Sequence, residues 1–226
     1  TTNTNYTVTG TTNGCTNTKT VSVTVTPNPT VAVSNATICS GTSTVLTASG
    51  AATYSWNTSA TTNTISVSPT VNTNYTVTGT TNGCTNTKTL SVTVKTTPTV
   101  AVSNATICSG KTATLTASGA TTYSWSTSAT TSSITVSPTS NTNYTVTGTT
   151  NGCANTKTLT VTVNPSPTVT AVASPTSICV GQTVTLTASG AATYSWSTSS
   201  TNTVITVSPT VTTVYTATGT TAGCST

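Results

Sequence analysis

The feature that most constrains this chain is its internal repetition. The motif ICxG begins at Ile38, Ile107 and Ile178, so the chain repeats after 69 and then 71 residues. The block TNYTVTGTTNGC occurs three times as well, and a degenerate fourth copy ends at Cys224. A period of this length is too long for one turn of a solenoid and suits a small independent domain. The sequence therefore predicts a tandem array.

The copies divide the chain into four parts. Residues 1–28 are expected to be the C-terminal F–G hairpin of a preceding repeat, 29–97 and 98–166 two complete repeats, and 167–226 a repeat that lacks its last strand. The joints between them read TPNPT, KTTPT and NPSPT. Proline stiffens such joints and blocks strand continuation, which predicts semi-rigid hinges. Because the chain begins and ends inside a repeat, we expect a segment of a longer polypeptide, with any export signal or anchor outside it.

Each repeat is predicted to be a small β-sandwich. Valine alternates with Thr and Ser, no stretch has a helical period, and turn residues fall at even spacing. Asn-Gly in the last loop of each complete repeat is a strong hairpin signal. We expect about seven short strands, which in the second repeat cover residues 99–107 (A), 112–117 (B), 122–125 (C), 132–137 (D/E), 144–148 (F) and 156–163 (G).

Two aromatic positions recur in these strands. A Trp lies 17 residues after the ICxG cysteine in every copy, as expected of the strand C tryptophan in an immunoglobulin-like core. A Tyr at the start of strand F is placed as a tyrosine corner would be. A binding platform is the alternative, but core-facing positions favour the core. The predicted core aromatics are Trp56, Trp125, Trp196, Tyr75, Tyr144 and Tyr215.

Composition excludes most chemistry. The chain has no Asp, Glu, His, Arg, Met or Phe, while Thr accounts for 74 of 226 residues. Without carboxylates or imidazoles there is no ordinary general acid or base and no nucleophilic triad, so we expect no catalytic residue and no enzyme. Calcium typically needs carboxylates, and no CxxC pair is present for zinc, so no metal and no cofactor are expected.

The charge is small and dispersed. Five lysines give a formal charge of +5, and Lys19, Lys88 and Lys157 occupy one position in successive repeats. A nucleic-acid binder would cluster basic residues beside aromatics, so no nucleic-acid partner is expected. Solvated lysines that keep exposed strands from pairing with other chains are the preferred interpretation. The sequence also has no apolar run long enough for a transmembrane helix.

The ordered motifs resemble a known kind of repeat. ICxG, TLTASG, YSW, ITVSPT, YTVTGTTNGC and TVTV follow one another through the chain. This pattern is similar to the immunoglobulin-like, polycystic-kidney-disease-like repeats of large secreted surface proteins of Bacteroidota, among them gliding-motility-type adhesins exported by the type 9 secretion route. The resemblance implies a β-sandwich array, an extracellular or cell-surface location and a stalk role.

Seven cysteines at repeating intervals also indicate an oxidising, extracellular setting. Four precede or begin the last strand of a repeat, in the F–G loop, and three follow the first strand, in the A–B turn. In immunoglobulin topology these two loops lie at opposite ends of a sandwich, roughly 25 Å apart, whereas a disulfide needs Cα atoms within about 7 Å. The F–G cysteines are Cys15, Cys84, Cys153 and Cys224, and the A–B cysteines are Cys39, Cys108 and Cys179.

Three pairing patterns stay open. The favoured one joins successive repeats, Cys39 with Cys153 and Cys108 with Cys224, and leaves Cys15, Cys84 and Cys179 for repeats outside this chain. The second pairs cysteines within one repeat, such as Cys39 with Cys84. The third links separate chains. Only the first pattern would lock each joint twice, by proline and by a disulfide.

The function predicted from these features is a non-enzymatic stalk or filament segment of a secreted bacterial surface protein. Its partners would be neighbouring repeats of the same polypeptide and, in a filament, identical chains. The alternative is an adhesive module whose loops bind glycans or a host surface. Thr ladders invite an ice-binding interpretation, but Thr is simply the commonest outward residue on these strands. Six N-x-S/T sites and the Thr-rich faces are further candidates, for glycosylation.

Overall fold

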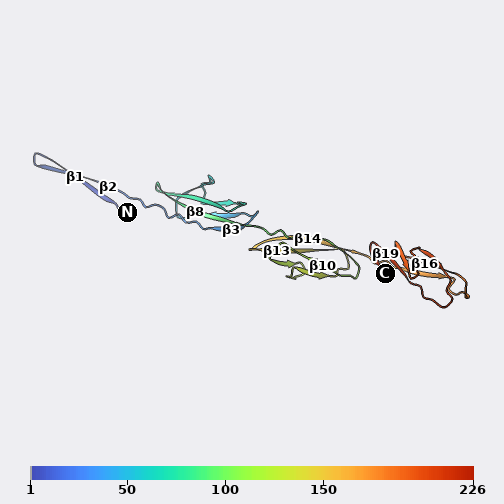
Figure 1. Cartoon of the computed structure of the whole chain (residues 1–226). Coiled ribbons are helices and arrows are strands. Elements are labelled where there is room, and N and C mark those ends of the chain that lie inside the picture. The colour runs from blue at the N-terminus through green and yellow to red at the C-terminus, as the bar shows by residue number, and fades with distance from the viewer. Residues whose placement is uncertain (1) are drawn as a thin grey trace. The chain divides into compact units, whose positions relative to one another are not determined.

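The computed structural model describes residues 2–226, and within them it contains strands and no helix. The chain forms two compact units, residues 1–97 and 98–226, which we describe separately (Figure 1). Antiparallel strand pairs predominate, joined by short turns. The predicted all-β class is confirmed.

The first unit opens with an exposed hairpin. Strand β1 (Thr4–Thr12) pairs with β2 (Cys15–Val23), and Thr12 lies opposite Cys15, so the loop holds only two residues. Asn13 and Gly14 in that loop have φ values of 49° and 78°. Positive φ at both central residues defines the type I′ turn that the Asn-Gly signal predicts. Every residue of the two strands is exposed.

The rest of the first unit is a two-sheet sandwich. One sheet has the order β3-β8-β7-β5 and the other pairs β4 with β6, with a single bridge between Ala32 and Ser49 extending the second sheet. The parallel partner of β8 is β3. The strands are β3 (Ala36–Cys39), β4 (Thr44–Thr47), β5 (Thr53–Trp56), β6 (Thr64–Val67), β7 (Thr73–Thr81) and β8 (Cys84–Lys95).

The second unit begins with a sandwich of the same design. Its sheet order is β11-β13-β14-β9, with β10 paired to β12 and a bridge from Ala101 to Ser118. These are the strands C-F-G-A′ and A-B-E of an immunoglobulin-like sandwich. The strands are β9 (Ala105–Cys108), β10 (Ala113–Thr116), β11 (Thr122–Trp125), β12 (Ser133–Val136), β13 (Thr142–Thr150) and β14 (Cys153–Asn164).

Two details differ from the sequence prediction. The predicted strand A does not run unbroken through residues 99–107, because the chain leaves the A–B–E sheet after Ala101 and joins the other sheet as β9. Asn104 stabilises this crossing, since its Oδ1 accepts a hydrogen bond of 2.9 Å from the Thr160 amide of β14. The predicted D/E region is the single strand β12.

The predicted tryptophans lie in the cores. Trp125 is 3% exposed and its Nε1 donates a 2.9 Å hydrogen bond to the Thr131 carbonyl, which satisfies the indole buried among apolar side chains. Trp56 and Trp196 are equally buried. Around Trp125 pack Leu115, Ile134, Val136, Val146, Leu159 and Val161.

The tyrosine hydroxyl that bonds to nearby backbone lies on strand C, and not at the start of strand F where the sequence predicts a tyrosine corner. Tyr75 is buried, and Tyr144 and Tyr215 pack against their cores at intermediate exposure. The hydroxyl that bonds locally to backbone belongs instead to the strand C tyrosine. Tyr123 Oη accepts from the Ala120 amide at 3.0 Å and donates to the Ala120 carbonyl at 2.9 Å. Tyr54 and Tyr194 occupy the same position.

The third repeat departs from the other two. Its sheets have the orders β15-β16-β18 and β17-β19-β20. In the second repeat, β9 pairs with the end of the last strand, β14. The last strand of the third repeat, β20, holds only two residues, so the segment after β15 has no such partner and forms no counterpart of β9. The strands are β15 (Thr170–Ser174), β16 (Val184–Ser189), β17 (Thr193–Trp196), β18 (Val204–Val207), β19 (Ala217–Thr221) and β20 (Cys224–Ser225).

Candidate functional site

The chemically distinctive site of the second unit is the joint between its two repeats. Strand β9 ends at Cys108, where Ser109 and Gly110 form a turn closed by a 3.0 Å hydrogen bond from the Lys111 amide to the Cys108 carbonyl. The parallel register of β9 and β14 sets Cys108 opposite Asn164. The A–B turn and the end of strand G therefore lie together at one end of the second sandwich.

The third repeat presents its F–G hairpin to this joint. Thr221 lies opposite Cys224, so the turn is again two residues long, with Ala222 at φ 50° and Gly223 at φ 79°. Cys224 is 1% exposed. The tight turn is therefore followed directly by Cys224, which begins the last strand and has a buried side chain.

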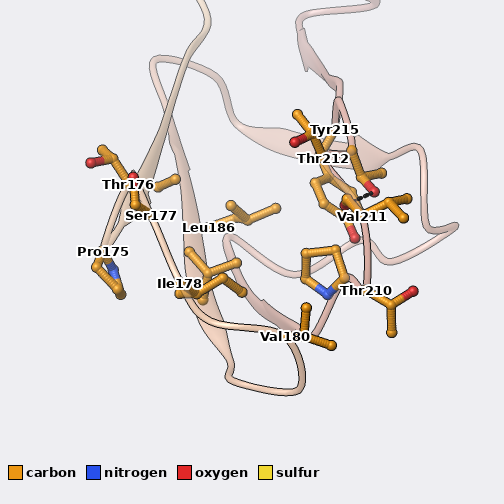
Figure 2. Close-up of a pocket in the computed structure, with 14 residues that line it drawn as sticks. Pro175, Thr176, Ser177, Ile178, Val180, Leu186, Thr210, Val211, Thr212 and Tyr215 are labelled. Atoms are coloured by element: carbon orange, nitrogen blue, oxygen red, sulfur yellow. Dashed lines mark hydrogen bonds between the residues drawn. The ribbon is translucent and has the colours of Figure 1, made fainter.

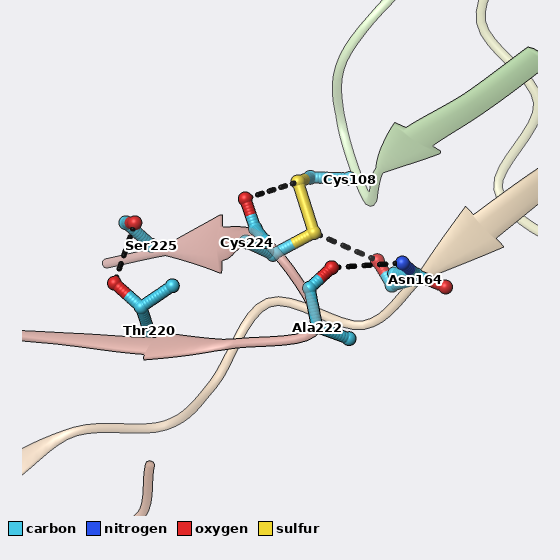
Figure 3. Close-up of a disulfide and its surroundings, with 7 residues drawn as sticks. Cys108, Asn164, Thr220, Ala222, Cys224 and Ser225 are labelled. Atoms are coloured by element: carbon cyan, nitrogen blue, oxygen red, sulfur yellow. Dashed lines mark hydrogen bonds between the residues drawn. A yellow bond between two sulfur atoms is a disulfide. The ribbon is translucent and has the colours of Figure 1, made fainter. Parts of the chain in front are cut away.

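Figure 3 shows the resulting bond between Cys108 and Cys224, whose Cα atoms are 5.5 Å apart and 116 residues apart in sequence. Asn164 contacts the hairpin on the other side of this bond. Its Nδ2 donates a 3.0 Å hydrogen bond to the Ala222 carbonyl, and its own carbonyl oxygen lies 3.8 Å from Cys224 Sγ. The joint therefore combines a covalent bond between repeats with a side-chain contact between them.

Pairing within the second repeat is blocked by the length of strand G. Cys153 begins β14 and Asn164 ends it, so the two residues are separated by about 36 Å at ~3.3 Å per residue. Cys108 lies opposite Asn164. A disulfide allows about 7 Å between Cα atoms, so Cys108 cannot reach Cys153.

The other cysteines fall into two groups. Cys39 and Cys153 are also disulfide-bonded, and their pairing with each other stays a prediction. Cys15, Cys84 and Cys179 are free thiols. Cys84 Sγ nevertheless lies 3.5 Å from the carbonyl oxygen of Thr26, just beyond β2, much as Cys224 lies beside the Asn164 carbonyl.

At two of the proline joints, the proline carbonyl accepts a hydrogen bond from an asparagine side chain that the sequence analysis missed. Asn155 Nδ2 donates a 3.0 Å hydrogen bond to the carbonyl of Pro98, and Asn86 does the same to Pro29 at 2.9 Å. Both prolines are buried. The asparagine two residues after the F–G cysteine, in the motif C-x-N, was the available signal.

The third repeat has an open groove of about 490 Å³, lined by apolar residues together with Thr and Ser. Figure 2 shows Ile178 and Leu186 between the segment at Pro175 and the segment carrying Val211 and Tyr215. In the second repeat, Leu159 of β14 lies opposite Tyr144, the counterpart of Tyr215, and is 2% exposed in the core. The groove therefore lies where, in the second repeat, core side chains pack against strand G.

The outer surface is uncharged apart from lysines. Cross-strand hydroxyl pairs join Thr76 to Thr89 at 3.2 Å and Thr78 to Thr87 at 3.0 Å. Across residues 2–226, no cluster of metal-ligating side chains occurs. No helix in the described part of the chain could span a membrane.

Comparisons with known proteins identify no family. No family model matches the chain, and no curated protein matches it. The structure of the eight N-terminal Ig domains of the Down syndrome cell adhesion molecule is 13% identical, with a TM-score of 0.36 over 85% of this chain. The chain spans only 37% of that structure.

Two further structures are comparably distant. The titin I67–I69 E-to-A variant is 12% identical, with a TM-score of 0.38 over 89% of this chain and 96% of its own. Sidekick-1 immunoglobulin domains 1–5 are 13% identical, with a TM-score of 0.33 over 88% of this chain and 57% of their own. These likenesses are too low to carry an argument, and the strand order defines the class: tandem, disulfide-bonded, immunoglobulin-like β-sandwiches.

Proposed function

We propose that this chain is a structural stalk segment of a secreted bacterial surface protein, of the kind found in Bacteroidota and exported by the type 9 route. In this proposal the repeats, bounded as 29–97, 98–166 and 167–226, act as spacers whose joints are stiffened by proline and by disulfides. The observation that carries it is the bond between Cys108 and Cys224, which links one repeat to the next.

Several features support a spacer over a binding module. The repeats 29–97 and 98–166 share their core aromatics, their turns and their Asn–Pro contacts, so neither of these two differs from the other in a way that marks an adhesive tip. The outer strands present Thr, Ser and a few Lys, which keeps the surface soluble at low charge. Cys39–Cys153 is proposed as a second bond of the same type, with Cys15, Cys84 and Cys179 reserved for further copies of the repeat.

Non-reducing peptide mapping by mass spectrometry tests the joint chemistry. The proposal requires crosslinked peptides containing Cys39 with Cys153 and Cys108 with Cys224. A Cys39–Cys84 crosslink would mean that the disulfides staple single repeats, and the stalk would lose its covalent joints. Protease shaving of intact cells tests location, because a surface stalk must be removed by protease added outside.

Adhesion to glycans remains the alternative to a stalk. No described feature favours a particular loop as a glycan site, so we assign none. A glycan array probed with the oxidised chain decides between them, since a pure spacer binds no glycan.

A further inference from the structure

The disulfide of the second unit encloses almost all of that unit. Cys108 and Cys224 lie 116 residues apart, and the strands from β10 to β19 all fall between them. Only residues 98–108 and 224–226 of the unit lie outside the enclosed loop. Pulling on the two ends of the unit therefore does not pull on the loop.

The covalent route between those ends is short. It passes from residue 98 along the first strand to Cys108, across the disulfide to Cys224, and on to Thr226. Measured from Thr99, eleven peptide steps and one disulfide with 5.5 Å between its Cα atoms give a fully extended length of roughly 42–45 Å. The same two residues would be roughly 420–460 Å apart along the extended chain if the disulfide were absent.

We propose that tension along the second unit is carried by the first strand of the second repeat, the Cys108–Cys224 disulfide and β20, and that the strands from β10 to β19 bear none. The inference rests on the proposed stalk function and deepens it: the second unit is an inextensible tether. Unfolding of the enclosed sandwich strands cannot lengthen it, because the loop that they form is closed at its base.

The segment that carries the tension, residues 98–108, is also held firmly in the second sandwich. Pro98 is fixed through its carbonyl by Asn155, and Val100 is 5% exposed in the core. Ala101 exchanges 3.0 Å hydrogen bonds with Ser118, and β9 then pairs in parallel with the end of β14. A segment tied at both ends and paired along its length stays in place under tension, because all its lateral contacts would have to break together.

Single-molecule force spectroscopy on the full chain tests this inference. Handles are attached at Thr99, which is exposed, and at Thr226 through unnatural amino acids, so that no thiol is added. The oxidised molecule should show no unfolding step up to forces that break covalent bonds. After reduction of the same molecule, steps that sum to about 400 Å should appear, as 116 residues become extensible.

Two variants make the result specific. The double variant Cys108→Ser/Cys224→Ser should lengthen without reductant, as the reduced wild type does. The control Cys179→Ser removes a free thiol outside this bond and should keep the oxidised trace. Steps of hundreds of ångströms in the oxidised wild type overturn the inference, as does a reduced molecule that fails to lengthen. A chain that is absent from the cell surface would overturn the stalk function and leave this measurement unchanged.

Discussion

Asn164 lies opposite Cys108 at the end of the parallel pair formed by β14 and β9, and its side-chain amide binds the Ala222 carbonyl of the next repeat. Asn164 thus ends strand G of the second repeat and also binds the F–G hairpin of the third repeat. This relationship brings Cys224 to Cys108, because the hairpin that Asn164 binds is the one that carries Cys224. The joint is therefore built from residues far apart in sequence.

Removing the disulfide should destabilise the second unit. Loop-closure entropy for a loop of 116 residues is worth about 5 kcal/mol, shared between the two joined repeats. The double variant Cys108→Ser/Cys224→Ser should therefore unfold at lower urea than the oxidised wild type, measured by tryptophan fluorescence. Cys179→Ser is the matched control and should leave the midpoint unchanged. Equal midpoints for the double variant and the control would contradict this expectation.

Truncating a core tryptophan should strongly lower the free energy of unfolding. Trp125→Ala removes a side chain that is 3% exposed and deletes the hydrogen bond to Thr131, and such truncations cost roughly 3–5 kcal/mol. Trp125→Phe retains much of the apolar contact and should cost less. Urea unfolding followed by circular dichroism measures both. A loss as small for Ala as for Phe would show that the indole is not packed as described.

Gly148 has a matched control in the hairpin at the start of the chain. A Cβ at Gly148 would lie 2.6 Å from Val100 Cγ2 and 2.7 Å from Ala120 Cβ, whereas a Cβ at Gly10 meets nothing within 4 Å. Gly148→Ala should destabilise its repeat by about 1–3 kcal/mol through overpacking. Gly10→Ala, at the same place in the repeat, should be close to neutral. Thermal unfolding of the two variants tests the difference in sign and size.

The turn beside the disulfide offers a stabilising substitution. Ala222 adopts φ 50°, a conformation that costs an ordinary L-residue roughly 1–2 kcal/mol and that Asn tolerates better. Ala222→Asn should recover part of that cost and raise the melting temperature. Asn82→Ala, at φ 50° in the first repeat, is the reverse change and should lower it. Shifts of the same sign in the two variants would contradict the turn argument.

Chelation should have no effect on folding. The chain contains no carboxylate or imidazole, and the described residues hold no cluster of metal ligands. Excess EDTA should therefore leave the melting temperature unchanged in calorimetry. A drop on chelation, reversed by calcium or zinc, would reveal a site made of carbonyl oxygens or thiolates.

Local patterns in the sequence determined the class of this protein. Alternating Val and Thr predicted the strands, Asn13-Gly14 and its copies predicted two-residue turns, and the spacing from cysteine to Trp125 predicted the core position of the indole. These inferences succeed because strand alternation, left-handed turns and the burial of a large aromatic side chain depend on neighbours within one strand or hairpin.

Only the tertiary structure decided the finer points. Three of them depend on which strands lie beside each other: the crossing of the chain between sheets after Ala101, the hydrogen bonds of the Tyr123 hydroxyl, and the hydrogen bond from Asn155 to the Pro98 carbonyl. The same holds for the joint: Cys108 and Cys224 meet because β9 ends beside Asn164, a neighbour 56 residues along the chain. Sequence periodicity marks equivalent residues in successive repeats, but contacts between non-equivalent residues follow from sheet order and register, which side-chain alternation alone does not specify.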